Sequence, residues 1–511
     1  MAFLIVVPRD GSSEFESPVF ESILDDHKSL TYPANSCKQY SIGGIRIWTY
    51  DRNSSVPENE NVIDSDGVYI GVGCAILQDR GVADVKSIFK AKGSHPEAIQ
   101  GDYLIFGLDS KGNGGIYSTT MTFCSLFHHK ATNHDIFSTD IGLLHRCLRS
   151  RNNKKTGDFF DSNFIYESIE NEWGSREFPE LTMFSDIKRV LTTTQYKFDN
   201  YSLSSKSVQY ELFRPELEEM YLNNRKNFYD HTFNLIESSI RYVLDKTKTD
   251  EMEILMSGGL DSRLSSALIK PLASEYGISL KATTFGPEDH PDVIIGKRVA
   301  ESLDIPWVNK TGDGKIWMPR SVEDYRNCMR CSWGDWNSNN WRTSNSFQNK
   351  LVLSGQDNYK RHNWAKIFSM NRWYAARMSY TSTFPVLSHQ IINDMVLIYG
   401  KHAFHIAMFE FAFELLKRYS PDLLDIPLVG MQIPQHPIEP FSTVRASKQM
   451  PSIDAEAFFD QELASKVLSF IQFEPSKEIK INSILGDKRK KRIVMDYASM
   501  MDEPASHYIT F

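Results

Sequence analysis

The chain has 511 residues and carries 57 lysines and arginines against 65 aspartates and glutamates, for a formal net charge of −8. At roughly 150 residues per domain this length allows two or three sizeable cores. With six cysteines in a chain of this length, a small disulfide-stapled protein is excluded. The content of 41% hydrophobic and 24% charged residues is typical of a globular protein. The negative charge disfavours a nucleic-acid partner and an anionic membrane surface, so we expect neither.

No stretch of the sequence reaches the ~18 consecutive apolar residues that a membrane-spanning helix needs. Residues 2–7 form an apolar run of six, and no positive region precedes it as in a secretory signal. We therefore expect a first strand here, and a cytoplasmic protein with reduced thiols. Cys328 and Cys331 form a single CxxC, which is a weak signal for zinc or redox chemistry.

Short strand-like runs separated by turn clusters dominate residues 1–210 and predict a β-rich α+β domain. The runs span residues 2–8, 44–50, 68–77, 102–108, 115–118 and 195–198. Little in the polar stretch 200–209 favours burial, so we expect a domain boundary near residue 210.

The pattern changes after this boundary. Apolar residues recur at spacings of three and four over residues 233–244, as on one face of a helix. Strand-like and helix-like runs then alternate, which predicts parallel strands joined by crossover helices. The expected strands are 253–256, 280–285, 306–308 and 351–354, with helices after residue 261 and over 292–303. From residue 388 onward the pattern is mainly helical.

Residues 256–263, Met-Ser-Gly-Gly-Leu-Asp-Ser-Arg, stand directly between a predicted strand and a predicted helix. Two glycines allow a tight turn, after which backbone N–H groups and a helix N-terminus point to one spot and can bind a phosphate chain. Asp261 is a candidate Mg²⁺ ligand, and Arg263 would add positive charge. The alternative is a turn in which serine and aspartate only cap the helix. The candidate ATP-binding residues are Ser257, Gly258, Gly259, Leu260, Asp261, Ser262 and Arg263.

This run resembles the loop of the PP-loop ATP pyrophosphatases, which cleave ATP between the α and β phosphates. A Walker A string, GxxxxGK[ST], is absent from the sequence, which disfavours transfer of the γ phosphate. Residues 283–292 and 300–304 resemble the second strand and helix of asparagine synthetases. The resemblance implies that Phe285 and Gly286 bind adenosine and that Asp292 opens the next helix, so all three residues are further candidates for ATP binding.

Further strings extend the resemblance to asparagine synthetases over most of the chain. Residues 101–109, 135–140 and 181–188 resemble strings of their glutaminase-like domain, and residues 384–388 resemble their Pro-Phe-Leu-Asp string. The resemblance implies an α+β Ntn-hydrolase-like, class II amidotransferase-like domain over residues 1–210. Over residues 211–511 it implies an α/β PP-loop synthetase domain, adenine nucleotide α-hydrolase-like, with a helical C-terminal part. It also implies ATP and Mg²⁺ as cofactors.

The second residue departs from this family. A working class II glutaminase exposes an N-terminal cysteine after Met1 is removed, whereas this chain has Ala2 and its first cysteine is Cys37. We therefore expect the N-terminal domain to have lost ammonia production. β-Lactam synthetases and lasso peptide cyclases also lack this cysteine; they adenylate a carboxylate and let an amine of the same substrate close a ring, which loses little further entropy.

Residues 354–359, Ser-Gly-Gln-Asp-Asn-Tyr, depart from the Ser-Gly-Glu-Gly-x-Asp of asparagine synthetases. The resemblance implies that Ser354 and Gly355 bind ATP. Gln356 replaces a glutamate of the acyl-transfer site; its amide cannot act as a base but can orient a substrate.

The family's second metal ligand is also altered. Tyr359 stands in the matching position, which leaves Asp357 as the candidate second Mg²⁺ ligand, or as a turn cap. Lys448 is the candidate for the catalytic lysine of the ring-forming members, whose charge steadies the developing oxyanion. Three tryptophans within residues 331–341 either shape an acyl-substrate pocket or cover the core. The basic run 488–492 is either a partner-binding face or a solvated helix face.

These features predict an ATP-dependent carbon-nitrogen ligase or cyclase that releases AMP and pyrophosphate and has no glutaminase activity of its own. The expected substrate is a small molecule or peptide with a carboxylate and an amine, as in the biosynthesis of a peptide antibiotic or another specialised metabolite. Partner biosynthetic proteins and a homodimer are compatible with this function. The alternatives are an amidotransferase that uses free or partner-supplied ammonia and a degenerate nucleotide-binding protein.

Overall fold

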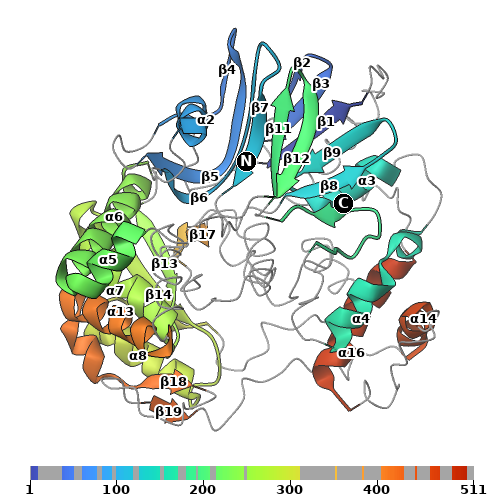
Figure 1. Cartoon of the computed structure of the whole chain (residues 1–511). Coiled ribbons are helices and arrows are strands. Elements are labelled where there is room, and N and C mark those ends of the chain that lie inside the picture. Colours follow the sequence, from blue (N-terminus) through green and yellow to red (C-terminus); the bar gives the residue numbers. More distant parts are fainter. Residues whose placement is uncertain are drawn as a thin grey trace.

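The computed structural model describes residues 2–9, 37–50, 60–77, 83–94, 99–118, 126–149, 155–170, 180–191, 194–207, 215–246, 250–310, 351–353, 383–384, 404–430, 443–445, 461–471 and 486–502. Within them the protein is a mixed α/β molecule with two antiparallel sheets, one parallel sheet and a two-stranded parallel pair (Figure 1).

The first antiparallel sheet has the strand order β10-β8-β9-β1-β3-β2. Its strands are β1 (Ala2–Pro8), β2 (Cys37–Ile42), β3 (Ile45–Tyr50), β8 (Phe127–Lys130), β9 (His134–Ser138) and β10 (Lys188–Arg189). The second has the order β12-β11-β7-β6-β5-β4. It consists of β4 (Val62–Asp64), β5 (Gly67–Leu77), β6 (Ile99–Asp109), β7 (Gly114–Ser118), β11 (Thr194–Asp199) and β12 (Ser202–Ser207).

The two antiparallel sheets pack face to face and are covered on their outer faces by helices. Alternate residues of β1 show this: Phe3 and Ile5 face the core between the sheets, whereas Leu4 and Val6 face a second core under helices. Since both faces of β1 are buried, its sequence is a continuous apolar run. Helix α2 (Val85–Ser94) covers the outer face of the second sheet. The layers therefore run helix, sheet, sheet, helix.

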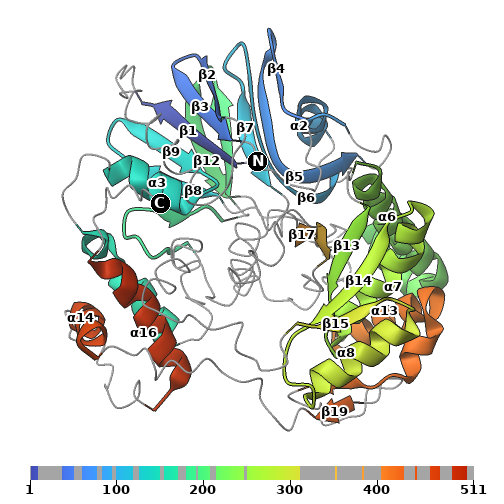
Figure 2. The same cartoon turned by 180° about the vertical axis from the view of Figure 1, so that it is seen from behind.

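The helices over the first sheet come from two distant parts of the sequence. They are α3 (Ile141–Arg149), the 3₁₀ turn η2 (Thr156–Phe159), α4 (Ser162–Glu170), α14 (Gln461–Ile471) and α16 (Lys488–Met501). Val467 and Val494 of the last two helices lie in one core with Phe164 of α4. Figures 1 and 2 show α14 and α16 beside α4, away from the parallel sheet. The predicted boundary near residue 210 stays a prediction, and helices α14 and α16 pack with the helices over the first antiparallel sheet.

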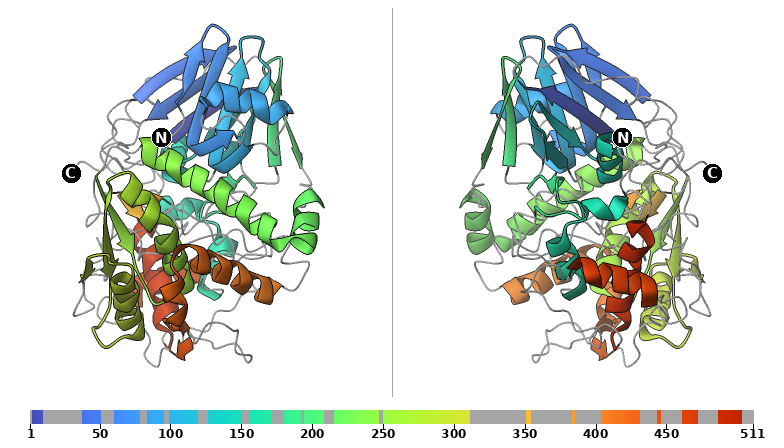
Figure 3. Two further views of the ribbon diagram at one scale, coloured as in Figure 1. Left: turned by 90° about the vertical axis from the view of Figure 1, so that its left-hand side faces the viewer. Right: turned by 90° about the vertical axis from the view of Figure 1, so that its right-hand side faces the viewer.

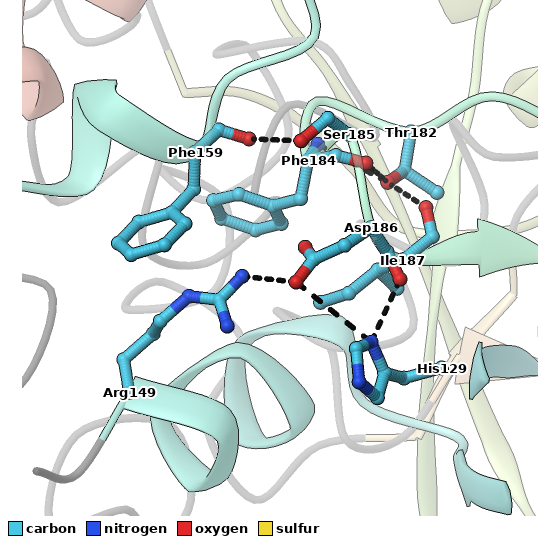
Figure 4. Close-up of polar contacts among 8 residues, drawn as sticks. All are labelled: His129, Arg149, Phe159, Thr182, Phe184, Ser185, Asp186 and Ile187. Atoms are coloured by element: carbon cyan, nitrogen blue, oxygen red, sulfur yellow. Dashed lines mark hydrogen bonds and ion pairs between the residues drawn. The ribbon is translucent and has the colours of Figure 1, made fainter. Parts of the chain in front are cut away.

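A partly buried polar cluster connects the end of α3 to the turn that precedes β10 (Figure 4). The Arg149 guanidinium forms an ion pair with Asp186 and lies 3.7 Å from the centre of the Phe159 ring. His129 Nδ1 lies 2.8 Å from the backbone oxygen of Asp186, and the Thr182 hydroxyl donates within the same turn at 2.7 Å. The cluster joins β8, α3 and residues 182–187, which are not consecutive in sequence.

The parallel sheet has the order β15-β14-β13-β16-β17 and lies next to helices α5 to α8 and α13. Its strands are β13 (Glu251–Leu255), β14 (Ser279–Thr284), β15 (Trp307–Asn309), β16 (Leu351–Leu353) and β17 (Thr383–Phe384). The helices are α5 (Pro215–Asn223), α6 (Arg225–Lys246), α7 (Leu260–Glu275), α8 (Pro291–Ser302) and α13 (Phe404–Tyr419). Met252 and Ile254 share a core with α6, α7, α8 and α13, in which α7 and α8 lie against the strands and α6 and α13 pack on α7. Figure 3 shows the same elements from two further sides.

Two expectations about the ends of these regions need comment. Residues 202–207 of the polar stretch 200–209 form the edge strand β12, because an exposed edge strand needs no apolar face to pair with β11. The helical end expected after residue 388 contains α13, α14 and α16, but also the paired strands β18 (Leu428–Gly430) and β19 (Thr443–Arg445). Of the helices that the structure describes, none is long and apolar enough to span a bilayer.

Candidate functional site

The strand order of the parallel sheet singles out the end of β13. From this strand the chain moves to β14 and β15 on one side, whereas β16 and β17 pair on the other side. β13 and β16 run parallel and in register, Ile254 opposite Leu353, so their carboxyl ends are neighbours at the point where the order reverses. Open α/β sheets bind their ligands at this point. The loop after β13 is the predicted phosphate-binding run.

Serine hydroxyls organise this loop. Ser262 Oγ accepts a hydrogen bond from the backbone N–H of Ser257 at 3.1 Å and lies 3.1 Å from the Ser257 hydroxyl. Ser257 Oγ in turn accepts from the N–H of Gly259 at 3.2 Å. Gly259 is the N-cap of α7 and has no side chain that could cap the helix. The hydroxyls thus fold the loop without covering the helix N-terminus, where an anion binds most favourably.

Asp292 links the loop to the next helix. Its Oδ1 accepts a hydrogen bond from the Gly258 N–H at 3.0 Å, and its own N–H donates to Nδ1 of the buried His290, the N-cap of α8, at 3.2 Å. The sequence prediction that Asp292 opens a helix is confirmed within one residue, since α8 begins at Pro291. The structure adds a direct contact between its carboxylate and the loop.

The two loop glycines are used differently. A Cβ on Gly258 would lie 2.3 Å from Val429 Cγ2, so only glycine fits, and the Gly258 carbonyl accepts from the Val429 N–H at 2.9 Å. Among the residues that the structure describes, a Cβ on Gly259 would meet only Ser257 Oγ, at 3.3 Å. Within this part of the chain the loop is closed toward β18 and open at the N-terminus of α7, which fits a phosphate group there.

Arg263 lies away from this opening. Its side chain is fully buried and donates to the backbone carbonyls of Leu423 at 3.1 Å and Pro427 at 2.8 Å, and also to that of Ile426. Burial, and secondarily the charge of Arg298, lower the pKa of its guanidinium to about 10. The expected contribution of its charge to phosphate binding has no support in this geometry, because its donors are directed at residues 423–427.

The predicted adenosine residues follow β14. Gly286 is buried with φ of +139°, a conformation that favours glycine, and its carbonyl accepts from Asn309 Nδ2 at 3.0 Å. Phe285, which stands between the end of β14 and Gly286 in the sequence, is half-buried. Both residues follow the strand that neighbours β13, at the same edge of the sheet as the loop.

Comparisons with known proteins add little to this geometry. No protein-family model matches the chain, and no curated protein does. A glutamine phosphoribosylpyrophosphate amidotransferase from B. subtilis, complexed with ADP and GMP, is similar over 60% of this chain and 65% of its own, less than two thirds, with 7% identity and a TM-score of 0.26. An NMN synthetase from Francisella tularensis is similar over 54% of this chain and 95% of its own, with 13% identity and a TM-score of 0.21. TM-scores this low assign neither fold nor activity.

Several predicted site residues lie outside the part that the structure describes. These are the side chain of Asp261, the residues Ser354, Gly355, Gln356, Asp357 and Lys448, the CxxC and the tryptophan-rich segment. Leu260 and Asp261 form the first turn of α7. Among the described residues, no group of three or more His, Cys, Asp or Glu side chains could hold a metal ion. The roles predicted for these residues stay predictions.

Sequence reasoning missed a buried ionic group in the parallel sheet. Glu253 is fully buried on β13, where its Oε1 forms an ion pair with Lys310 and accepts from the Thr283 hydroxyl. A glutamate inside a run that predicts a buried strand was the available signal, because a buried carboxylate requires partners.

Proposed function

We propose that the chain is an ATP-dependent carbon-nitrogen ligase that binds the phosphates of ATP at the loop Ser257–Ser262. The observation that supports this most is the position of the loop, between the carboxyl end of β13 and the N-terminus of α7, whose N-cap is Gly259, at the reversal point of the strand order. The string Ser-Gly-Gly-Leu-Asp-Ser at this place resembles the loop of the PP-loop pyrophosphatases.

The proposed reaction has two balanced steps. A substrate carboxylate oxygen attacks the α phosphorus of ATP, which forms an acyl-adenylate and releases pyrophosphate. An amine then attacks the acyl carbon, which forms an amide and releases AMP and a proton. In this scheme Ser257 to Ser262 bind the pyrophosphate portion, Phe285 and Gly286 bind adenosine, and Asp261 with Asp357 holds Mg²⁺, which would neutralise phosphate charge. Gln356 and Lys448 remain the proposed acyl-transfer residues.

The N-terminal region supports an amine source other than glutamine. It has helix, sheet, sheet, helix layers, and β1 begins at Ala2, where a class II glutaminase requires its cysteine nucleophile. We therefore propose that the amine belongs to the acyl substrate or to a second small molecule or peptide, as in the formation of a ring or an amide of a specialised metabolite. Free or partner-supplied ammonia is the competing source.

The product nucleotide tests the proposal. Purified protein is given α-labelled MgATP with candidate amino-carboxylates, with and without ammonium salts, and the products are separated. We expect AMP and pyrophosphate in equal amounts, and exchange of labelled pyrophosphate into ATP. Formation of ADP, or no binding of MgATP by calorimetry, would overturn the assignment; turnover that requires ammonium would select the ammonia-using alternative, and binding without turnover would select the degenerate one.

A matched pair of serines tests the loop itself. Ser257→Ala removes a hydroxyl from the phosphate loop, whereas Ser266→Ala removes one from the next turn of α7, where it donates to the Ser262 carbonyl at 2.6 Å. A hydrogen bond to a charged group contributes about 1.5 to 3 kcal/mol, so we expect Ser257→Ala to weaken ATP binding about tenfold or more. Ser266→Ala should leave the ATP Kd unchanged within about twofold; equal effects would argue against the loop.

A further inference from the structure

The arginine of the loop motif contacts a segment that is about 160 residues away in sequence. Arg263 lies in the first turns of α7, and its guanidinium donates to three backbone carbonyls around the 3₁₀ turn η5 (Pro421–Asp425). A guanidinium is suited to this because it presents five N–H donors in a rigid plane, whereas a lysine ammonium is a compact point charge. The side chain is fully buried, so these contacts are sheltered from water.

The segment that accepts hydrogen bonds from Arg263 continues directly into β18, the strand that contacts the phosphate loop. Strand β18 begins at Leu428, one residue after the Pro427 carbonyl that accepts from Arg263. The N–H of Val429 donates to the Gly258 carbonyl at 2.9 Å, and its Cγ2 lies 2.3 Å from the place of a Cβ on Gly258. Val429 thus supports the face of the loop opposite its opening.

Strand β18 also pairs with β19 (Thr443–Arg445). β18 pairs in parallel with β19, Leu428 opposite Thr443 and Gly430 opposite Arg445. Residues 443–445 are therefore fixed relative to Gly258 through β18. Arg263 stands at the start of this series of contacts, which runs from α7 to residues 423–427, then to Val429 and Gly258.

We infer that Arg263 is a positioning residue for nucleotide binding: it sets the conformation of the phosphate loop through residues 423–429 and does not itself contact a phosphate. The inference rests on the proposed binding of ATP at this loop. A role in packing alone would affect stability, whereas the positioning role requires that the ATP affinity of the folded protein depend on Arg263.

Lysine substitution tests the inference, with a second cation of the same helix as control. Arg263→Lys keeps a buried cation but cannot hold three carbonyls in one plane. Lys270→Met removes a cation of α7 that also donates to a backbone carbonyl, that of Leu303, but far from the loop. ATP and inorganic pyrophosphate Kd values are measured by calorimetry, beside the thermal midpoint, for both variants and the unchanged protein.

We expect Arg263→Lys to weaken ATP and pyrophosphate binding about tenfold. Lys270→Met should leave both Kd values within about twofold, even where it lowers the thermal midpoint. A folded Arg263→Lys protein with unchanged Kd values overturns the inference. Failure of the unchanged protein to bind either ligand overturns the proposed function instead, which separates the two.

A second substitution keeps the test decisive if Arg263→Lys does not fold. Val429→Ala removes the methyl groups beside Gly258 while leaving the Arg263 contacts in place. We expect it to weaken ATP binding about threefold to tenfold, and to be non-additive with Arg263→Lys where both fold, since coupled residues give non-additive effects. An unchanged Kd for Val429→Ala, or strictly additive effects, overturns the inference.

Discussion

The antiparallel and parallel sheets of this chain accommodate a buried carboxylate in different ways. Asp135, at the start of β9, is hydrogen-bonded at its rim position by His128 at 2.7 Å and by Arg9 at 2.6 Å, and Arg9 reaches solvent. Glu253 lies in the middle of β13, fully buried, with Lys310 as its ion-pair partner. The two cations are similarly exposed, with 25% of the Lys310 side chain and 30% of the Arg9 side chain accessible. The sites differ in the carboxylate: Glu253 is fully buried in the middle of a parallel strand, whereas Asp135 lies near the end of an antiparallel strand and has two partners that can carry positive charge.

Of the substitutions that test this comparison, removal of Lys310 in the parallel sheet should reduce the free energy of unfolding most. Lys310→Met removes the cation that pairs with the buried Glu253, and we expect a loss of about 4 kcal/mol in the free energy of unfolding, because removing one partner of a buried ion pair costs about 3 to 5 kcal/mol. Denaturant unfolding at pH 7 measures it. Lys297→Met is the control, since its pair with Glu301 is exposed and contributes little.

The double variant Glu253→Gln with Lys310→Met isolates the charge. A neutral amide can still accept from Thr283, so we expect it to regain at least half of the lost stability. A double variant as unstable as Lys310→Met would show that the lysine acts through packing and not through the ion pair.

The second prediction asks which region the C-terminal helices stabilise. Leu468 of α14 is buried in the core over the first antiparallel sheet, so Leu468→Ala should cost about 3 kcal/mol. Hydrogen exchange should show lower protection in β1, β8 and β9 and unchanged protection in β13 and β14. The control Leu222→Ala affects an exposed side chain of α5 and should change neither. Loss of protection in β13 would mean that the two regions unfold as one unit.

This arrangement shows what local patterns can and cannot predict. The runs expected at 2–8, 44–50, 68–77 and 102–108 match β1, β3, β5 and β6 closely, because short apolar runs between turn residues report local burial. The packing of α14 on α4 joins residues about 300 apart, and no local period encodes such a contact. The basic run 488–492 illustrates this, since Lys490 pairs with Glu170 and Lys491 is buried.

Some features of the candidate site could be predicted from the sequence, and others depend on contacts between distant residues. The position of Ser257, Gly258, Gly259 and Ser262 in a loop between a strand and a helix could be predicted from sequence, whereas their binding of phosphate stays a prediction. The role of Arg263 could not, because it depends on carbonyls of residues 423–427 that only the folded chain brings near. Asp292 was predicted at a helix start, but its bond to Gly258 needed the sheet register.

The third prediction concerns pH and the antiparallel side of the comparison. Burial alone would raise the pKa of Asp135, but hydrogen bonds from His128 and Arg9 outweigh it and lower the pKa to about 2. A lowered folded-state pKa stabilises the protein above the unfolded value near 3.8, and this contribution is lost as the pH falls toward 2. It amounts to about 2 kcal/mol at neutral pH.

Asp135→Asn should therefore reduce the free energy of unfolding by about 2 kcal/mol at pH 7, and the difference from the unchanged protein should shrink toward zero near pH 2. Denaturant unfolding across this range measures it. The control Asp64→Asn removes an exposed carboxylate bonded to Lys86 and should show a much smaller pH-dependent difference. A pH-independent effect of Asp135→Asn would assign Asp135 a role in packing alone.

The smallest expected effect concerns the hydrogen bond between α16 and α4. Tyr497 is buried and its hydroxyl donates to Ser168 Oγ at 3.2 Å, so Tyr497→Phe should cost about 1 kcal/mol, the net contribution of a typical hydrogen bond. Ser168→Ala should cost a similar amount, because Ser168 also donates to the Phe164 carbonyl at 2.8 Å. Denaturant unfolding of the double variant should show less than the sum, since the two changes remove one shared bond. Full additivity would mean that α16 is held on α4 by its apolar face alone, which is how the Leu468 prediction treats α14.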